Sequence, residues 1–152
     1  MKVEDLYQDI ILDHYRTKHH SGLREPFDAE VRHVNPTCGD EVLLRVRLDE
    51  DTVTDVSYEA MGCSISQASA SVMTDLVVGR PLADAMTAHE AFLRLMQSKG
   101  DEAAVDEDLL EDAVAFAGVS KYPARIKCAL LAWMAWKDAT ARALGEKTEE
   151  SA

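Results

Sequence analysis

Apolar and polar residues alternate with two different periods along the first part of the chain. Over residues 3–18 the apolar positions have helical spacing, which predicts an opening amphipathic helix. Residues 19–27 contain histidines, a glycine and a proline that break this spacing, so we expect a loop there. Alternation and a richness in Val, Thr and Tyr then predict strands over 29–34, 42–48 and 52–60. Their short connections favour an antiparallel meander.

The second part of the chain has helical spacing throughout. Ser64 to Gln67 has the form of a capping box, and apolar residues at helical spacing continue to Leu76. Gly79 and Pro81 close this helix and open another. The remaining expected segments are, in order, a helix with an apolar side from Leu82 to Met96, a surface loop over 98–108, a short helix over about 107–117, and a final helix from about Pro123 to about Leu144.

The order of these elements indicates the fold class. Strands followed by helices are typical of an α+β fold, here a three-stranded antiparallel sheet packed against a helical layer. A chain of 152 residues is long enough for one buried core, so we expect residues 1–145 to form a single domain and residues 146–152 a flexible tail.

The charge balance excludes one class of partner. Asp and Glu number 28 against 16 Lys and Arg, a net charge of −12, and such a surface repels the phosphate backbone of nucleic acids. No run of 18 apolar residues occurs, so no membrane span is predicted. The first residues lack the apolar stretch of a signal peptide, which favours a cytoplasmic location.

Three cysteines are expected near the ends of elements. Cys38 precedes Gly39 and Asp40 in the turn between the first two strands, so its thiol and the carboxylate share one loop. Cys63 stands where the third strand gives way to a helix, whose free N–H groups favour a thiolate. Cys128 lies early in the final helix. An odd number of cysteines in a reducing compartment makes metal binding or reactivity a better hypothesis than a disulfide framework.

If these element ends converge, three thiolates and one carboxylate provide a four-coordinate site suited to Zn²⁺. The alternative is that each cysteine is a small buried apolar residue, and the spacing, which matches no local zinc-finger pattern, leaves both readings open. Arg125 and Lys127 flank Cys128 and either offset the negative charge of such a site or are simply solvated helix residues.

The histidines predict no second metal site. None of the five forms a ligand pair at convincing spacing, and His19 with His20 is interpreted as a solvated pair on a loop. Trp133 and Trp136 are interpreted as packing residues of the last helix.

Three short motifs carry a resemblance to a known family. Cys38-Gly39-Asp40, the stretch from Met61 to Ser66 and the stretch from Ala124 to Cys128 resemble the motifs of the IscU/NifU-type iron–sulfur assembly proteins. Residues 6–15 resemble the N-terminal helix of the same group, and the resemblance spans roughly residues 4–140.

Within this group the chain looks like the SufU branch. IscU-type scaffolds carry a histidine just before the third cysteine, where this chain has Lys127. They also carry a Leu-Pro-Pro-Val-Lys chaperone-docking motif, where this chain has the stretch from Val119 to Pro123. The stretch between Cys63 and Cys128 also looks longer than in those scaffolds.

The resemblance implies a zinc site made by Cys38, Asp40, Cys63 and Cys128. It also implies that Cys38 accepts sulfur from a SufS-type cysteine desulfurase, a pyridoxal-phosphate enzyme, for the benefit of downstream cluster-assembly proteins of the SUF system. Arg125 matches a position associated with the desulfurase interaction.

Two other functions remain open at this stage. The same thiolates and carboxylate could ligate an iron–sulfur cluster, in which case the chain is a scaffold on which a cluster is built. A zinc-stabilised adaptor that never carries sulfur is the second alternative.

Overall fold

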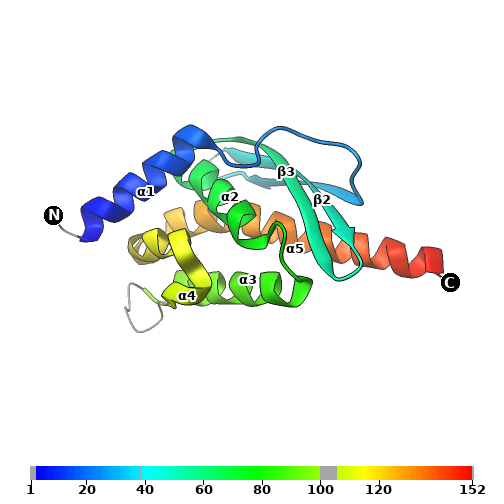
Figure 1. Cartoon of the computed structure of the whole chain (residues 1–152). Helices are drawn as coiled ribbons and strands as arrows, with labels where there is room; N and C mark the ends of the chain where they lie inside the picture. The colour runs from blue at the N-terminus through cyan, green and yellow to red at the C-terminus, as the bar shows by residue number, and fades with distance from the viewer. Residues whose placement is uncertain (1–2, 38, 100–105, 152) are drawn as a thin grey trace.

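The computed structural model describes residues 3–37, 39–99 and 106–151, and it confirms the expected α+β fold. Three strands are followed by a succession of helices, as the hydrophobic pattern predicts (Figure 1). The elements are α1 (Val3–Thr17), β1 (Ala29–Asn35), β2 (Asp40–Asp49), β3 (Thr52–Met61), α2 (Ser64–Val77), α3 (Leu82–Gln97), α4 (Glu107–Leu110), the 3-10 helix η2 (Glu111–Lys121) and α5 (Pro123–Ser151).

The sheet is an antiparallel meander in the order β1-β2-β3. The first pairing runs from Ala29 opposite Val46 to Asn35 opposite Asp40, and the register of β2 with β3 shifts at a bulge after Arg47. One face of β2 is apolar and buried, as its alternation predicts, because it faces the helices. The buried side chains of that face are Val42, Leu44, Val46 and Leu48.

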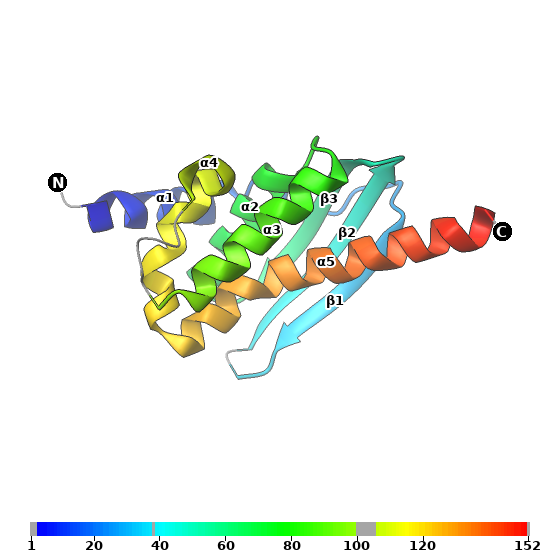
Figure 2. The same ribbon diagram turned by 90° about the horizontal axis from the view of Figure 1, so that it is seen from below.

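The helices cover one face of the sheet. Helix α5 crosses β1 and β2, and α2 lies beside it against β3 (Figure 2). Helix α3, α4 and η2 lie on the far side of α2 and α5 from the sheet (Figure 1), while α1 packs against α2 and η2 at one end. None of the helices in the described part of the chain is both long enough and apolar enough to cross a membrane.

Helix α2 is buried on nearly all sides, and its sequence explains how this is possible. Five of its eleven buried residues are alanine or serine, and these small side chains allow neighbouring backbones to come close. A buried hydroxyl needs a partner, and Ser69 Oγ donates to the carbonyl oxygen of Ala129 in α5 at 2.6 Å. This hydrogen bond ties the central helix to the helix that covers the sheet.

Three features differ from the sequence-based expectation: the start of α2, the helix expected over 107–117 and the end of α5. The N-cap of α2 is Cys63 rather than Ser64, and no capping box forms, because the Gln67 amide donates to the carbonyl of Gly62 at 2.8 Å. The expected helix over 107–117 is replaced by α4 and η2, since Glu111 adopts a positive φ of 47° that ends the first turn. Of the expected loop over 98–108, residues 100–105 lie outside the described part of the chain.

Helix α5 also continues past the expected end near Leu144, to Ser151. The residues after Gly145 include Glu and Lys, which are good helix formers, so this one glycine does not end the helix.

The core contains one histidine among large aromatic rings. His89 is only 2% exposed and lies 5.8 Å from the ring centres of both Trp133 and Trp136, which confirms these tryptophans as packing residues. Neither ring nitrogen of His89 has a hydrogen-bond partner among the described residues. A histidine in such surroundings is held neutral, because charging it would place an uncompensated ion in the core.

Stability is therefore expected to fall as the pH is lowered below about 6.5, the ordinary histidine pKa. Burial holds the pKa of His89 below that value, with Lys137 acting in the same direction and Glu90 opposing both. Between the lowered and the ordinary pKa the unfolded chain binds the proton more readily, so acid favours unfolding. Urea unfolding of the wild type and His89→Leu across this pH range measures the effect, and the variant should lose less stability.

His33→Gln is the matched control. His33 is partly exposed and its Nε2 lies 2.9 Å from Oδ2 of Asp138, so its loss leaves the core histidine unchanged. If the free energy of unfolding fell as steeply on acidification in His89→Leu as in the wild type, the assignment to His89 would be wrong.

Candidate metal centre

Three of the predicted ligands come together where the sheet meets two helices. Asp40 is the first residue of β2, Cys63 is the N-cap of α2, and Cys128 lies in the second turn of α5. One carboxylate oxygen of Asp40 and the two sulfur atoms all lie within 4.8 Å of one another. Asp40 and Cys128 are buried and Cys63 is partly buried, so the group opens to solvent at one side.

The carboxylate of Asp40 fixes the start of α2. Its Oδ1 accepts a hydrogen bond from the backbone N–H of Cys63 at 2.9 Å, and its Oδ2 lies 3.7 Å from the Cys63 sulfur. This arrangement requires Gly62 between strand and helix, because a Cβ at that position would overlap with Oδ1 of Asp40. Gly62 also has a φ of +137°, which residues with a side chain rarely adopt.

The sulfur of Cys128 is approached by an amide that sequence reasoning missed. Asn35, buried at the end of β1, directs its Nδ2 toward the Cys128 sulfur at 4.0 Å. An N–H group aimed at sulfur favours the thiolate form that a metal needs. The sequence contains a signal, since Asn35 directly precedes Pro36 in the stretch that leads to Cys38, although this pattern by itself predicts only a turn.

The sulfur of Cys63 has a hydroxyl as neighbour. Ser66 Oγ lies 3.8 Å from that sulfur and donates to the carbonyl oxygen of Cys63 at 3.1 Å. Cys63 is also the N-cap of α2, and the free N–H groups of a helix N-terminus carry partial positive charge, which favours a thiolate there.

The remaining predicted site residues are not brought into this group by the described contacts. Cys38 lies outside the described residues; in the sequence it stands between Asn35 and Asp40, which pair across β1 and β2. Arg125 and Lys127 are exposed on α5, and their predicted charge-compensating or partner-binding role stays a prediction.

The three described residues fit a zinc ion. Tetrahedral zinc with sulfur and oxygen ligands places its ligand atoms about 3.3–3.8 Å apart. The ligand atoms here, within 4.8 Å of one another, need to close by only about 1 Å, within reach of ordinary side-chain rotations. Thiolates with one carboxylate suit zinc and also iron, so the donor set is consistent with either metal.

Exposed apolar side chains adjoin the site along the chain. Val34 precedes Asn35, Met61 precedes Gly62, and Tyr122 lies just before α5. All three are among the exposed large apolar residues of the described chain. Apolar groups beside a polar site are a feature of surfaces that receive a partner.

Comparison with known proteins identifies the family of this chain. Residues 6–129 match the family model described as NifU-like N terminal domain. The chain is 40% identical over 144 residues to the zinc-dependent sulfurtransferase SufU of Bacillus subtilis (strain 168), which covers 94% of this chain and 95% of that protein. It is also 40% identical over 141 residues to the iron–sulfur cluster assembly scaffold protein IscU of Streptococcus pyogenes serotype M1, which covers 93% of this chain and 86% of that protein.

A solved structure has the same architecture. The crystal structure described as that of an iron–sulfur cluster assembly scaffold protein for the SUF system, from Fervidobacterium islandicum AW-1, superposes with a TM-score of 0.79 at 33% identity. The match covers 91% of this chain and 98% of that one. The chain therefore belongs to the NifU-like N-terminal domain family, which confirms the resemblance inferred from the three cysteine motifs.

Gly62→Ala is expected to damage the centre. The added methyl group must displace the Asp40 carboxylate, which breaks its hydrogen bond to the Cys63 N–H. We expect zinc affinity to fall by about tenfold or more, as for losses of groups that orient metal ligands. Competition with a chromophoric chelator measures the affinity.

Gly79→Ala is the matched control. Gly79 also has a positive φ, at 80°, but a Cβ there would meet nothing within 4 Å. Gly79→Ala therefore introduces the same kind of backbone strain as Gly62→Ala, but no overlap with a neighbouring side chain. Equal loss of zinc affinity in both variants would show that strain, rather than displacement of Asp40, is responsible.

Proposed function

We propose that this chain accepts sulfur from a cysteine desulfurase during iron–sulfur cluster assembly, with Cys38 as the acceptor. The observation that carries the proposal is the convergence of Asp40, Cys63 and Cys128 at the end of the hairpin whose turn contains Cys38 in the sequence. The relative from Bacillus subtilis is a zinc-dependent sulfurtransferase, and it matches this chain over nearly its full length.

Asp40, Cys63 and Cys128 would hold a zinc ion, with Cys38 as the fourth ligand. A zinc ion bound there keeps thiol groups deprotonated and protects them from oxidation. The buried carboxylate and the Asn35 amide hold their positions through contacts within the protein, so the ligand set is largely assembled by folding.

The transfer itself is a thiol exchange at sulfur. The Cys38 thiolate attacks the terminal sulfur of a persulfide on the desulfurase. A new S–S bond forms to Cys38, the S–S bond of the donor breaks, and the donor cysteine leaves as a thiolate. One sulfur atom moves from the donor cysteine to Cys38, and the negative charge moves from Cys38 to the donor cysteine. One S–S bond breaks and one forms, so the step needs no added oxidant or reductant.

The positions of the other two cysteines favour Cys38 as the acceptor. Cys128 is 2% exposed within a packed helix, and Cys63 is held at an N-cap by the hydrogen bond to Asp40. The Cys128 sulfur is closed off from a partner, and the Cys63 sulfur is attached to a fixed helix end, so neither is as free as a turn residue to move toward a donor. Gly39, beside Cys38 in the sequence, is exposed and has open space where a Cβ would lie, so that side of the turn is accessible.

The partner we propose is a SufS-type pyridoxal-phosphate-dependent cysteine desulfurase. The exposed apolar residues Val34, Met61 and Tyr122 adjoin the site along the chain and suit a docking surface. Arg125 is exposed one turn before Cys128 and is available to an acidic group of the partner. Sulfur would pass from Cys38 to downstream cluster-assembly proteins.

Cys38→Ser is expected to keep the fold and abolish sulfur acceptance. The hydroxyl is a far weaker nucleophile toward sulfur than a thiolate, so no persulfide can form at this position. Mass spectrometry of intact and digested protein, after incubation with desulfurase, pyridoxal phosphate and isotopically labelled cysteine, locates the transferred sulfur.

Thr37→Ser, a change at the preceding residue of the same turn, is the matched control and should accept sulfur normally. A persulfide found on Cys63 or Cys128 in the wild type would make the acceptor assignment wrong. Labelled sulfur on none of the three cysteines would leave only the adaptor function.

The alternative function is a scaffold on which an iron–sulfur cluster is assembled. The relative from Streptococcus pyogenes has that name and is as similar to this chain as the sulfurtransferase. The same donor atoms of Asp40, Cys63 and Cys128 are compatible with iron.

Metal analysis of protein purified without oxygen distinguishes the two functions. We expect one zinc ion for each chain and no sulfide, because three thiolates with one carboxylate form a closed, four-coordinate zinc site. Asp40→Ala should lower the zinc content, since it removes a ligand. A brown protein with equal amounts of iron and labile sulfide would instead support the scaffold.

A further inference from the structure

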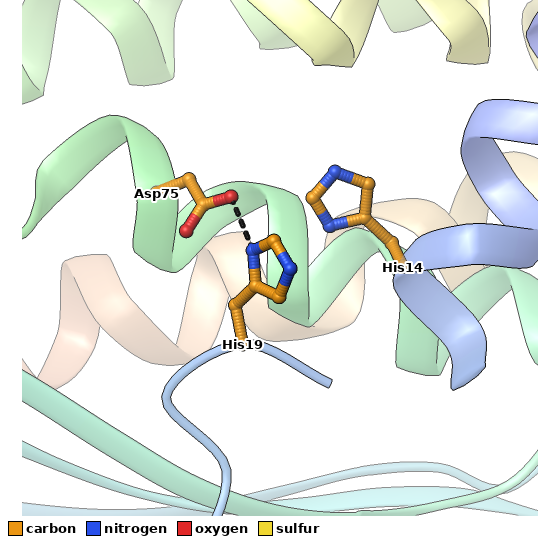
Figure 3. A group of neighbouring side chains, drawn as sticks. All are labelled: His14, His19 and Asp75. Atoms are coloured by element: carbon orange, nitrogen blue, oxygen red, sulfur yellow. Dashed lines mark hydrogen bonds and ion pairs between the residues drawn. The ribbon is translucent and has the colours of Figure 1, made fainter. Parts of the chain in front are cut away.

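A second group of metal-binding side chains lies away from the cysteines. His14 comes from the last turn of α1, His19 from the segment that follows it, and Asp75 from the last turn of α2 (Figure 3). One ring nitrogen of each histidine and one carboxylate oxygen lie within 4.8 Å of one another. The spacing of the histidines predicted no such group, because Asp75 is far from both in the sequence.

His14 is oriented as metal-ligating histidines usually are. It is 1% exposed, and its Nε2 lies 2.9 Å from Oδ2 of Asp112. Because a carboxylate can only accept a hydrogen bond, the Nε2–H group of His14 is the donor. In the neutral ring this leaves a lone pair on Nδ1, which accepts a hydrogen bond from Ser71 Oγ at 2.8 Å. A carboxylate that fixes the ring and its tautomer is the usual support of a histidine ligand.

His19 and Asp75 supply the exposed side of the group. His19 Nδ1 and Asp75 Oδ2 are 2.6 Å apart, and the two side chains are 39% and 37% exposed. The backbone of His19 is anchored to α2, because its N–H donates to Ser71 Oγ and its carbonyl accepts from Thr74 Oγ1. The rings of His14 and His19 are neighbours, with centres 4.7 Å apart and planes tilted by 54° (Figure 3).

The distances suit an ion after small movements. Two histidines and a carboxylate around a tetrahedral zinc-class ion place their donor atoms about 3.3 Å apart. His19 and Asp75 would move slightly apart and His14 would exchange its hydrogen bond to Ser71 for the ion. Both exposed side chains are free of core packing, so these rotations cost little. His20, whose Nε2 lies 3.7 Å from Oδ1 of Asp75, is the nearest further donor.

We propose that His14, His19 and Asp75 form a second metal site, which binds a divalent first-row transition metal such as Zn²⁺. Imidazole nitrogens with one carboxylate select this class of ion over Mg²⁺ and Ca²⁺. The site is separate from the cysteines: Cys63 and Asp75 stand at opposite ends of α2, about 18 Å apart at the helical rise for each residue. It does not depend on the proposed function.

The bound ion fastens α1 to the body of the protein. His14 is on α1 and Asp75 on α2, so the ion links these two helices directly, and His14 is joined to η2 through its contact with Asp112. Because an ion that binds only the folded chain stabilises it, filling the site raises the melting temperature and slows amide exchange in α1.

The test uses the full chain with its cysteine site already filled by one equivalent of Zn²⁺. Calorimetric titration with Co²⁺ should detect one further ion, and NMR should show paramagnetic broadening centred on His14, His19 and Asp75 rather than on Cys63. His19→Ala and Asp75→Asn, both at exposed positions that leave the core intact, should each weaken this binding by at least about tenfold. Asp112→Asn should weaken it less and leave the stoichiometry unchanged.

His33→Gln is the matched control, because His33 forms a histidine–carboxylate pair of similar length with Asp138 but has no third ligand among the residues that the structure describes. It should bind the second ion as the wild type does. The proposal is overturned if neither Zn²⁺ nor Co²⁺ perturbs the NMR signals of His14, His19 and Asp75 in the wild type, if His19→Ala and Asp75→Asn bind the ion as tightly as the wild type, or if Mg²⁺ binds equally well. Sulfur transfer to Cys38 is measured separately, so its failure would leave this result unaffected.

Discussion

The buried carboxylate of Asp40 is the interaction on which the candidate metal centre depends. It ends the β1–β2 turn, accepts the N–H of Cys63 at the start of α2 and stands within ligand distance of Cys128. A buried carboxylate is unfavourable unless hydrogen bonds or a cation compensate it, and here one backbone donor supplies only part of that compensation. The missing side chain of Gly62 provides the space for this contact. The Asp40 carboxylate thus lies where the sheet, α2 and α5 meet. A buried carboxylate is most stable beside a positive charge.

Helix α2 is the central element, because it contacts α1, α3, α5, η2 and β3. Its small side chains let α1, α5 and β3 approach it, and its buried hydroxyls bond to neighbouring backbone and side chains. Cys63 lies at its first end, and Asp75 lies near its last turn beside His14 and His19. A helix so completely enclosed has little freedom to bend, so it holds the two ligand groups at a nearly fixed separation.

Local patterns in the sequence predicted the elements, while contacts between distant residues required the structure. The buried face of β2 and the start of α5 at Pro123 follow from alternation and from a residue favoured in a first helical turn. The break at Glu111 depends on a backbone angle that no residue pattern specifies. Family motifs identified the cysteines. The contacts of Asn35 with Cys128 and of His19 with Asp75 join residues far apart in the sequence, so no local pattern predicts them.

Helix α5 is the last element of the chain, yet it covers β1 and β2 and carries Cys128. During synthesis the strands and α2 leave the ribosome first, at about 5–20 residues per second. Until α5 follows, the apolar face of the sheet has no cover and Cys63 lacks the sulfur that completes its surroundings. A nascent chain can therefore capture metal only through its earlier ligands. The candidate centre can thus be completed only after α5 has been made and has packed on the sheet.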